Sequence, residues 1–339
     1  MINTLAAFLT GGRMRRFSLA LLISLLCSFL CVYASVPNAR NFEFDYQVTV
    51  SDIPSNALNL KIWIPYLPQT SYQIVEDVAT SLSNHSAVTY DKKYSNKILY
   101  YSFKSPKDST IKIDIRYKVK RYEYSKKSPF KSDRPQESDD PQKYLAADRL
   151  VTMGPQIKTL ATEITSGKKA TMEKAKAIYD YVFENITYDK KIPGWGNGDT
   201  ERVCLVKAGN CTDFHSLFIS LARASGIPAK FVIGTSIPKE KQGEIKSYHC
   251  WAEFYDEKLG WVPVDISEAW KDKTAREYFF GTINEDRLEF THGRDIVLEP
   301  SQSCEPLNYF VYPYVELDGA AFKSVDAVFR FKDISDERG

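Results

Sequence analysis

The sequence predicts an α+β protein in which an antiparallel β-sandwich-like domain precedes helices packed on a second antiparallel sheet. Apolar and polar residues alternate over 41–50 and 110–120, which is typical of strands with one face in water. Apolar residues then recur at helical spacing over 171–186. Two more strand-like runs, 247–255 and 260–267, follow with a short turn between them.

The first 35 residues have the pattern of an export signal. Arg15 and Arg16 precede the apolar run 17–33, and small Ala34 ends it. We therefore expect a signal peptide over 1–34 and a periplasmic or secreted mature protein. The run is at the short end for a membrane span, which favours a cleaved signal. An uncleaved signal anchor is the alternative, and it would be the one attachment to a membrane.

Composition places the rest of the chain among ordinary globular proteins. Of the 339 residues, 43% are hydrophobic and 26% are charged. Removing the signal removes three arginines and no acidic residue, so the mature chain is close to neutral. No basic face or arginine-rich run favours nucleic acid as a partner.

We predict an N-terminal β domain over 37–124 and a linker over 125–142. Besides the two alternating segments, 58–66 and 97–103 also read as strands. The linker holds three prolines and almost no apolar residue.

Residues 143–320 are predicted to form the catalytic domain, followed by a C-terminal strand and charged tail over 321–339. In this domain we expect the helices to come first along the chain and the strands of an antiparallel sheet to follow them. The predicted helices are 155–166, 171–186 and 212–224; the strands are 229–237, 247–255 and 260–267, with 296–300, 308–317 and 327–331 as further strands.

The stretch GNCTDFHSLF, residues 209–218, places Cys211 at a predicted helix start. Free backbone N–H groups and the helix dipole favour a negative charge there, and so a thiolate over a thiol. By itself this position is more often structural than catalytic.

His249 and Asp265 lie on neighbouring strands of the predicted hairpin. In either plausible register, in which Trp261 faces Tyr255 or Glu253, the two side chains share one face of the sheet. A carboxylate beside an imidazole orients the ring and stabilises its charged form. We expect the helix that carries Cys211 to pack on this face, and Cys250 to point away from it as a small buried apolar residue.

Three blocks of the sequence together resemble the transglutaminase-like superfamily. They are KAGNCTDFHSLFISLARASGIPAKFVIGTSI, YHCWAEFY and GWVPVDISEAW, in that order over roughly 171–270. The resemblance implies a papain-like fold and a triad of Cys211, His249 and Asp265. It also implies acyl transfer through a thioester on Cys211, without a cofactor. The substrate would be a peptide or a protein.

The same resemblance raises the question of what binds the developing oxyanion. The backbone N–H of Cys211 is one expected donor, and Tyr188 and Trp195 are candidates for the second. Trp251 is a candidate for the wall of the acyl pocket. His215 stands where the family pattern has a small residue, and we expect it to be buried and hydrogen-bonded, or at the cleft edge.

Other interpretations stay open at this point. Cysteines and histidines near the site could bind zinc, although their spacing fits no compact zinc pattern. Cys204 could pair with Cys211, and Cys304 could pair with Cys204 or Cys250. A protein-crosslinking transglutaminase and a binding module without turnover are the alternatives to a hydrolase.

Overall fold

The structure is a computed structural model that describes residues 37–126 and 140–335. The predicted signal peptide and most of the predicted linker lie outside the described residues. Across the described ranges, no helix combines the length and the hydropathy that a membrane crossing requires.

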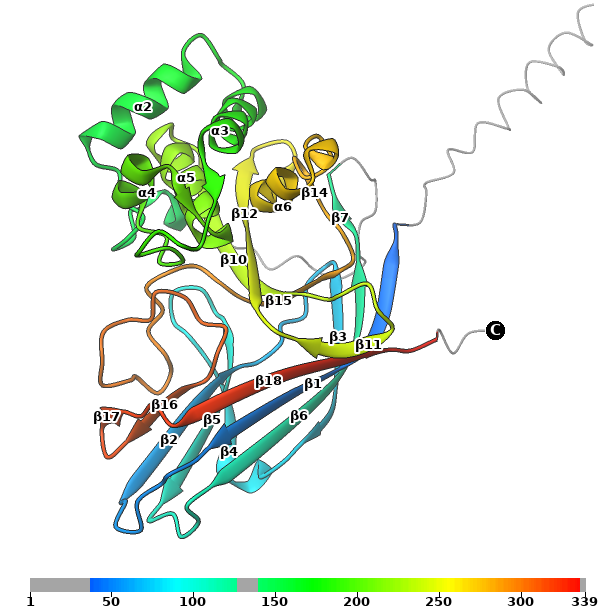
Figure 1. The fold of residues 1–339 in the computed structure, drawn as a ribbon, viewed down its shortest axis with the longest axis vertical. Helices are drawn as coiled ribbons and strands as arrows, with labels where there is room; N and C mark the ends of the chain where they lie inside the picture. Colours follow the sequence, from blue (N-terminus) through cyan, green and yellow to red (C-terminus); the bar gives the residue numbers. More distant parts are fainter. Residues whose placement is uncertain (1–36, 127–139, 336–339) are drawn as a thin grey trace, which may run out of the picture. The chain divides into compact units, whose positions relative to one another are not determined.

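Two five-stranded antiparallel sheets form the sandwich (Figure 1). Their inner side chains belong to one hydrophobic cluster, in which Phe44 and Tyr46 of one sheet join Ile62 and Tyr101 of the other. The first sheet has the order β11 (Gln242–Ile245), β18 (Val325–Asp333), β1 (Ala39–Val50), β6 (Ile111–Tyr122), β3 (Gln73–Thr80). The second has the order β17 (Ala320–Ala321), β16 (Tyr314–Leu317), β2 (Asn59–Pro65), β5 (Lys97–Lys104), β4 (Ser86–Tyr90).

Distant parts of the chain complete this sandwich. β18 lies between β1 and β11, and β16 adds to β2. The predicted domain boundaries stay predictions, but segments on both sides of residues 124 and 320 share sheets. Of the further strands expected late in the chain, 308–317 forms β16 in its last four residues and 327–331 lies within β18, and both belong to the sandwich.

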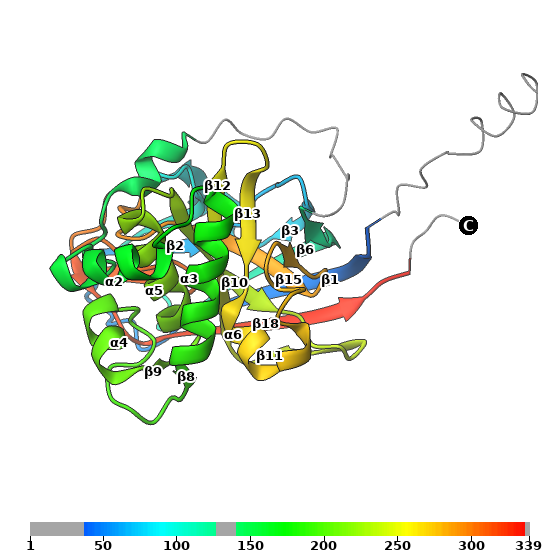
Figure 2. The ribbon, with the colours of Figure 1, turned by 90° about the horizontal axis from the view of Figure 1, so that it is seen from above.

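A second layer carries the helices and a four-stranded antiparallel sheet. The helices are α2 (Pro155–Thr165), α3 (Thr171–Asn185), α4 (Thr200–Val206), α5 (Cys211–Ala224) and α6 (Ile266–Lys271). The sheet has the order β13 (Gly260–Val264), β12 (Tyr248–Asp256), β10 (Ala229–Ser236), β15 (Arg287–His292). Helices α2, α3 and α5 lie on one side of β12, and strands β1, β3 and β6 lie on the other (Figure 2).

Short elements connect these layers. β7 (Tyr124–Ser125) pairs with β14 (Thr282–Ile283), and β8 (Thr187–Tyr188) pairs in parallel with β9 (Ala208–Gly209). Three 3-10 turns, η1 (Ser83–His85), η2 (Pro141–Leu145) and η3 (Lys273–Ala275), lie between larger elements.

The main helices and the hairpin form where the sequence predicts them, but several elements differ. Among the elements that were not predicted are β3, β4, β11, β15, α4 and α6. Residues 296–300, predicted as a strand, form only an isolated bridge between Ile296 and Leu307. These missed elements are four to eight residues long, and such a short pattern is difficult to recognise from its period.

Candidate functional site

A network of side chains fixes the start of α5. Asn210 is the N-cap, and its side-chain oxygen accepts a hydrogen bond from the Thr212 N–H at 2.9 Å. Asp213 completes a capping box by accepting the Asn210 N–H at 2.9 Å, and it also accepts N–H groups from Gly196 and Gly198. A Cβ on Gly209 would collide with the Asp213 side chain, so only glycine fits there.

This cap leaves one backbone donor of α5 unused. Asn210 accepts the N–H groups of Thr212, Asp213 and Phe214 through its side chain and its carbonyl. Among the described residues, no acceptor is found for the N–H of Cys211. The first residue of the helix therefore offers a free donor beside its own sulfur.

The hairpin brings His249 and Asp265 together. β12 and β13 pair with Tyr255 opposite Trp261, which is one of the two registers considered from the sequence. Asp265 lies one residue beyond β13, as the N-cap of α6, and its Oδ2 lies 2.6 Å from His249 Nε2. Because Nε2 faces the carboxylate, the other ring nitrogen is left for the Cys211 sulfur, which also helps to raise the pKa of the ring.

Asp265 is fully buried, and every side of its carboxylate is occupied. Oδ1 accepts the Glu268 N–H and the Ser267 hydroxyl, each at 3.1 Å. Oδ2 also accepts a hydrogen bond from Arg287 Nη2 at 3.2 Å. Arg287 comes from β15, which the sequence analysis missed, so this partner of the carboxylate was missed with it.

These contacts favour a thiolate–imidazolium pair. A hydrogen bond from Cys250 holds the pKa of Cys211 well below its usual range against the effect of burial, and the hydrogen bond and charge of His249 add to it. Burial alone would lower the pKa of His249, but the charge and hydrogen bond of Asp265 raise it to about 9.

His215 is buried and hydrogen-bonded, which is one of the two arrangements expected from the sequence. Its Nε2 accepts the Ile266 N–H at 3.0 Å, and its side chain has no exposed surface. Burial lowers the pKa of His215 to about 4, so the ring is neutral near pH 7. It is therefore poorly suited to act as the base.

The expected packing of α5 is wrong. Alternate residues Cys250, Ala252 and Phe254 of β12 belong to the same cluster as the inner face of α5, and the Phe218 and Phe254 rings lie 6.1 Å apart. The helix therefore covers the Cys250 face of β12, whereas His249 reaches the thiol from near the beginning of the strand. Cys250 is buried as expected, but it points toward the site.

The other candidate residues separate into two groups. Tyr188 pairs with Gly209 through β8 and β9, and its hydroxyl is charge-coupled to Cys211. Trp251 instead packs with Tyr124, Val232 and Ile283 on the sheet face away from α5, so it does not line the site at the thiol. Trp195 is 39% exposed, and no hydrogen bond, ion pair or ring contact joins it to Cys211 within the described residues.

Three tyrosines near the thiol were not singled out from the sequence. The Tyr248 hydroxyl accepts a hydrogen bond from Asn210 Nδ2 at 2.8 Å and lies 3.1 Å from Thr212 Oγ1. The rings of Tyr309 and Tyr312 lie 5.7 and 6.3 Å from the Tyr248 ring. Tyr248 directly precedes His249, and that position was the only available signal for it.

Comparison with known proteins finds a matching family model and a solved structure of similar fold. The family model "Transglutaminase-like superfamily" matches residues 158–266. A solved structure described as a "Putative Cysteine Protease from Cytophaga hutchinsonii" has a TM-score of 0.57 at 14% identity, covering 89% of this chain and 93% of that one. Residues 158–266 of this chain belong to the transglutaminase-like superfamily.

Two curated relatives extend the likeness in sequence. An uncharacterized protein of Haemophilus influenzae is 29% identical over 337 residues, covering 86% of this chain and 91% of that protein. An uncharacterized protein of Bacillus subtilis, YebA, is 28% identical over 140 residues, covering 36% of this chain and 19% of YebA.

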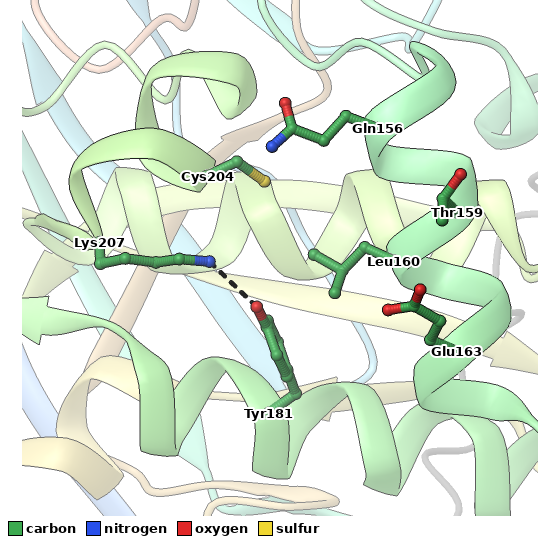
Figure 3. A pocket seen from close by; sticks show the side chains of 7 residues that line it. All are labelled: Gln156, Thr159, Leu160, Glu163, Tyr181, Cys204 and Lys207. Atoms are coloured by element: carbon green, nitrogen blue, oxygen red, sulfur yellow. Dashed lines mark hydrogen bonds between the residues drawn. The ribbon is translucent and has the colours of Figure 1, made fainter.

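The transglutaminase-like core also has a hollow of about 340 Å³ between α2, α3 and α4 (Figure 3). Lys207 Nζ donates a hydrogen bond to the Tyr181 hydroxyl at 3.0 Å across it. The hollow is lined by Gln156, Thr159, Leu160, Glu163, Tyr181, Cys204 and Lys207. None of the three proposed triad residues lines it.

The four described cysteines, Cys204, Cys211, Cys250 and Cys304, are free thiols. Neither the Cys204–Cys211 pair nor a pair that includes Cys304 is formed in this structure. Within 37–126 and 140–335, no three His, Cys, Asp or Glu side chains are grouped so that they could hold a metal ion.

The His249–Asp265 contact predicts a large change in the variant Asp265→Asn. Without the carboxylate charge, burial is opposed mainly by the Cys211 sulfur, and the pKa of His249 should fall from about 9 toward 6.5, the ordinary value. Asparagine can still cap α6. NMR titration of the four histidines would measure the change.

Glu268→Gln is the matched control, since Glu268 contacts Arg287 and reaches the His249 ring only through its charge. The pKa of His249 should change much less in this variant than in Asp265→Asn. The raised pKa also stabilises the fold fully below about pH 6.5, and this contribution should disappear as pH rises through about 9. An unchanged His249 titration in Asp265→Asn would contradict the assigned pair.

Proposed function

We propose that the protein is an exported cysteine acyl-transfer enzyme that hydrolyses peptide or amide bonds through a thioester on Cys211. The observation that carries the proposal is the 2.6 Å contact between His249 Nε2 and Asp265, on a ring whose pKa the Cys211 sulfur also helps to raise. In this arrangement the nucleophile contacts its base, and the base contacts the group that orients it.

In the first half-reaction, the Cys211 thiolate attacks the carbonyl carbon of the scissile amide. The tetrahedral oxyanion forms beside the helix start, where the free Cys211 N–H can donate to it. His249 then gives its proton to the leaving nitrogen, the C–N bond breaks, and a thioester remains. The Asp265 charge stabilises the imidazolium until that transfer.

In the second half-reaction, neutral His249 takes a proton from water as the water attacks the thioester. The C–S bond breaks, the carboxylic acid leaves, and the thiolate and imidazolium are restored. A primary amine in place of water would give transamidation, the chemistry of a crosslinking enzyme. The two outcomes share every residue named so far.

Cys211→Ala should abolish hydrolysis of a mixed peptide library, with a loss of at least about a thousand-fold. Iodoacetamide should alkylate Cys211 rapidly in the wild type and much more slowly in His249→Ala, because the thiolate loses its partner. Mass spectrometry of the peptide that carries Cys211 measures the labelling.

Cys204→Ala is the control, since Cys204 lies in the hollow away from the triad. Equal Cys211 labelling in the wild type and His249→Ala would contradict the triad. Amine incorporation into a glutamine-bearing protein in place of hydrolysis would favour the crosslinking enzyme. Wild-type phenotype and activity in Cys211→Ala would favour a binding module.

Tyr188 is our candidate for the second oxyanion donor. Its pairing with Gly209 and its charge coupling to Cys211 support this assignment. Tyr188→Phe should lower kcat by about a hundred-fold with little change in KM, because the hydroxyl would act only in the transition state. Steady-state kinetics on a cleaved peptide would measure this.

Trp195→Phe is the comparison, because Trp195 was the other sequence candidate and makes no such contact. It should retain activity near that of the wild type. If Tyr188→Phe were as active as the wild type, the second donor would lie elsewhere.

Export is supported by the sequence of residues 14–35, and it predicts the mature amino terminus. Cleavage after Ala34 would leave Ser35 as the first residue. Amino-terminal sequencing of protein purified from the producing cell would test this. Recovery of the intact signal in membranes would support the anchor.

A further inference from the structure

We propose that Lys190 binds a carboxylate of the substrate, so that the enzyme prefers peptides with an acidic residue near the bond that it cleaves. This inference rests on the proposed function for the role of Cys211 as nucleophile. It names a substrate class for that site and assigns it a specificity-determining residue that takes no part in the bond-breaking steps.

The first step is the position of Tyr188 beside the nucleophile. Tyr188 pairs with Gly209, which comes two residues before Cys211. The N–H of Asp189 donates a hydrogen bond to the Gly209 carbonyl at 3.0 Å, so the chain stays in contact with this segment beyond Tyr188. The Tyr188 ring lies 6.1 Å from the ring of Phe214, in the first turn of α5. A group held over the Tyr188 ring is therefore close to the helix start that carries the thiol.

The second step is a pair of ammonium groups over this ring. Lys190 Nζ lies 5.9 Å from the centre of the Tyr188 ring, and Lys271 Nζ, which comes from α6, lies 4.6 Å from it. Lys190 Nζ is also 5.5 Å from the centre of the Trp195 ring. Aromatic faces attract cations at such distances, so the rings favour this position of an otherwise exposed side chain.

The third step is the difference between these two cations. Lys271 Nζ lies 2.6 Å from a carboxylate oxygen of Glu268, so an acid of the protein already compensates its charge. Within residues 37–126 and 140–335, no carboxylate pairs with Lys190. Lys190 is therefore the cation beside Tyr188 that remains available to a carboxylate from outside the chain.

The fourth step is the anchoring of the loop that follows Lys190. Arg202 Nη2 donates a hydrogen bond to the Ile192 carbonyl at 3.2 Å. Further along, the buried carboxylate of Asp213 accepts the Gly196 N–H at 2.7 Å. A binding group on a fixed backbone loses less conformational freedom when a ligand arrives. The loop thus presents Lys190 to the substrate from a backbone that is already in place.

The first test uses peptides that the wild-type enzyme cleaves, made as pairs that differ only by glutamate or glutamine at one position near the scissile bond. For at least one position the wild type should cleave the glutamate peptide with a kcat/KM about five-fold higher, mainly through a lower KM, as expected of an exposed ion pair. Lys190→Ala should abolish this preference, Lys190→Glu should reverse it, and added salt should weaken it.

Lys191→Ala is the matched control. Lys191 is the next residue along the chain and is also exposed, but it lies over neither ring in the part of the chain that the structure describes. This variant should keep the wild-type preference. A wild type without any glutamate preference, or a preference that survives in Lys190→Ala, would overturn the proposal. Equal losses in Lys190→Ala and Lys191→Ala would overturn it too, because net charge alone would then be responsible.

The second test does not require hydrolysis. Iodoacetate is negatively charged and iodoacetamide is neutral, so the ratio of their rates of reaction with Cys211 reports the positive charge near the thiol. Mass spectrometry of the peptide that carries Cys211, from the full-length protein, measures both rates. At low ionic strength the ratio should fall about two-fold in Lys190→Ala and much less in Lys191→Ala.

Together the two tests separate this inference from the proposed function. If no peptide is cleaved but the ratio falls as expected, the proposed function fails and the anion site at Lys190 stands. If peptides are cleaved without a glutamate preference, the proposed function stands and the role of Lys190 is overturned. An unchanged ratio in the absence of cleavage would overturn both.

Discussion

The site depends on one buried charge, the carboxylate of Asp265. An isolated carboxylate in a dry interior would be too costly to keep ionised. Here His249 and Arg287 share one oxygen, and the start of α6 and the Ser267 hydroxyl occupy the other. Because β12, β15 and α6 each supply a partner, the position of His249 requires all three to be in place.

Much of this arrangement follows from local pattern. The alternation of the two strands predicted that His249 and Asp265 share one face of the sheet, and the observed pairing of Tyr255 with Trp261 is one of the two registers from which this was predicted. The pattern could not predict which face α5 would cover. Alternation says which side chains point the same way, but both faces of β12 are buried, one under α5 and one toward β7. Cys250 was misjudged for that reason.

What the sequence could not predict depends on partners distant in the chain. Arg287 lies in a six-residue strand, and its buried side chain pairs with Asp265 and Glu268, which come from a different part of the chain. Tyr248 and Tyr309 meet 61 positions apart in the chain, and no local period connects them. The free N–H of Cys211 follows from the cap made by Asn210, which a sequence motif indicates only in outline.

The pairing of β1 with β18 also affects the order in which the molecule can assemble. Synthesis delivers β1 early, but its neighbour on one side spans Val325–Asp333, near the far end of the chain. The same late strand binds β11, in the connection that leads into β12 and His249. A nascent chain therefore cannot complete this sheet until residue 333 is released. Contacts so distant in sequence also slow folding, so this sheet should form late in the folding of the chain.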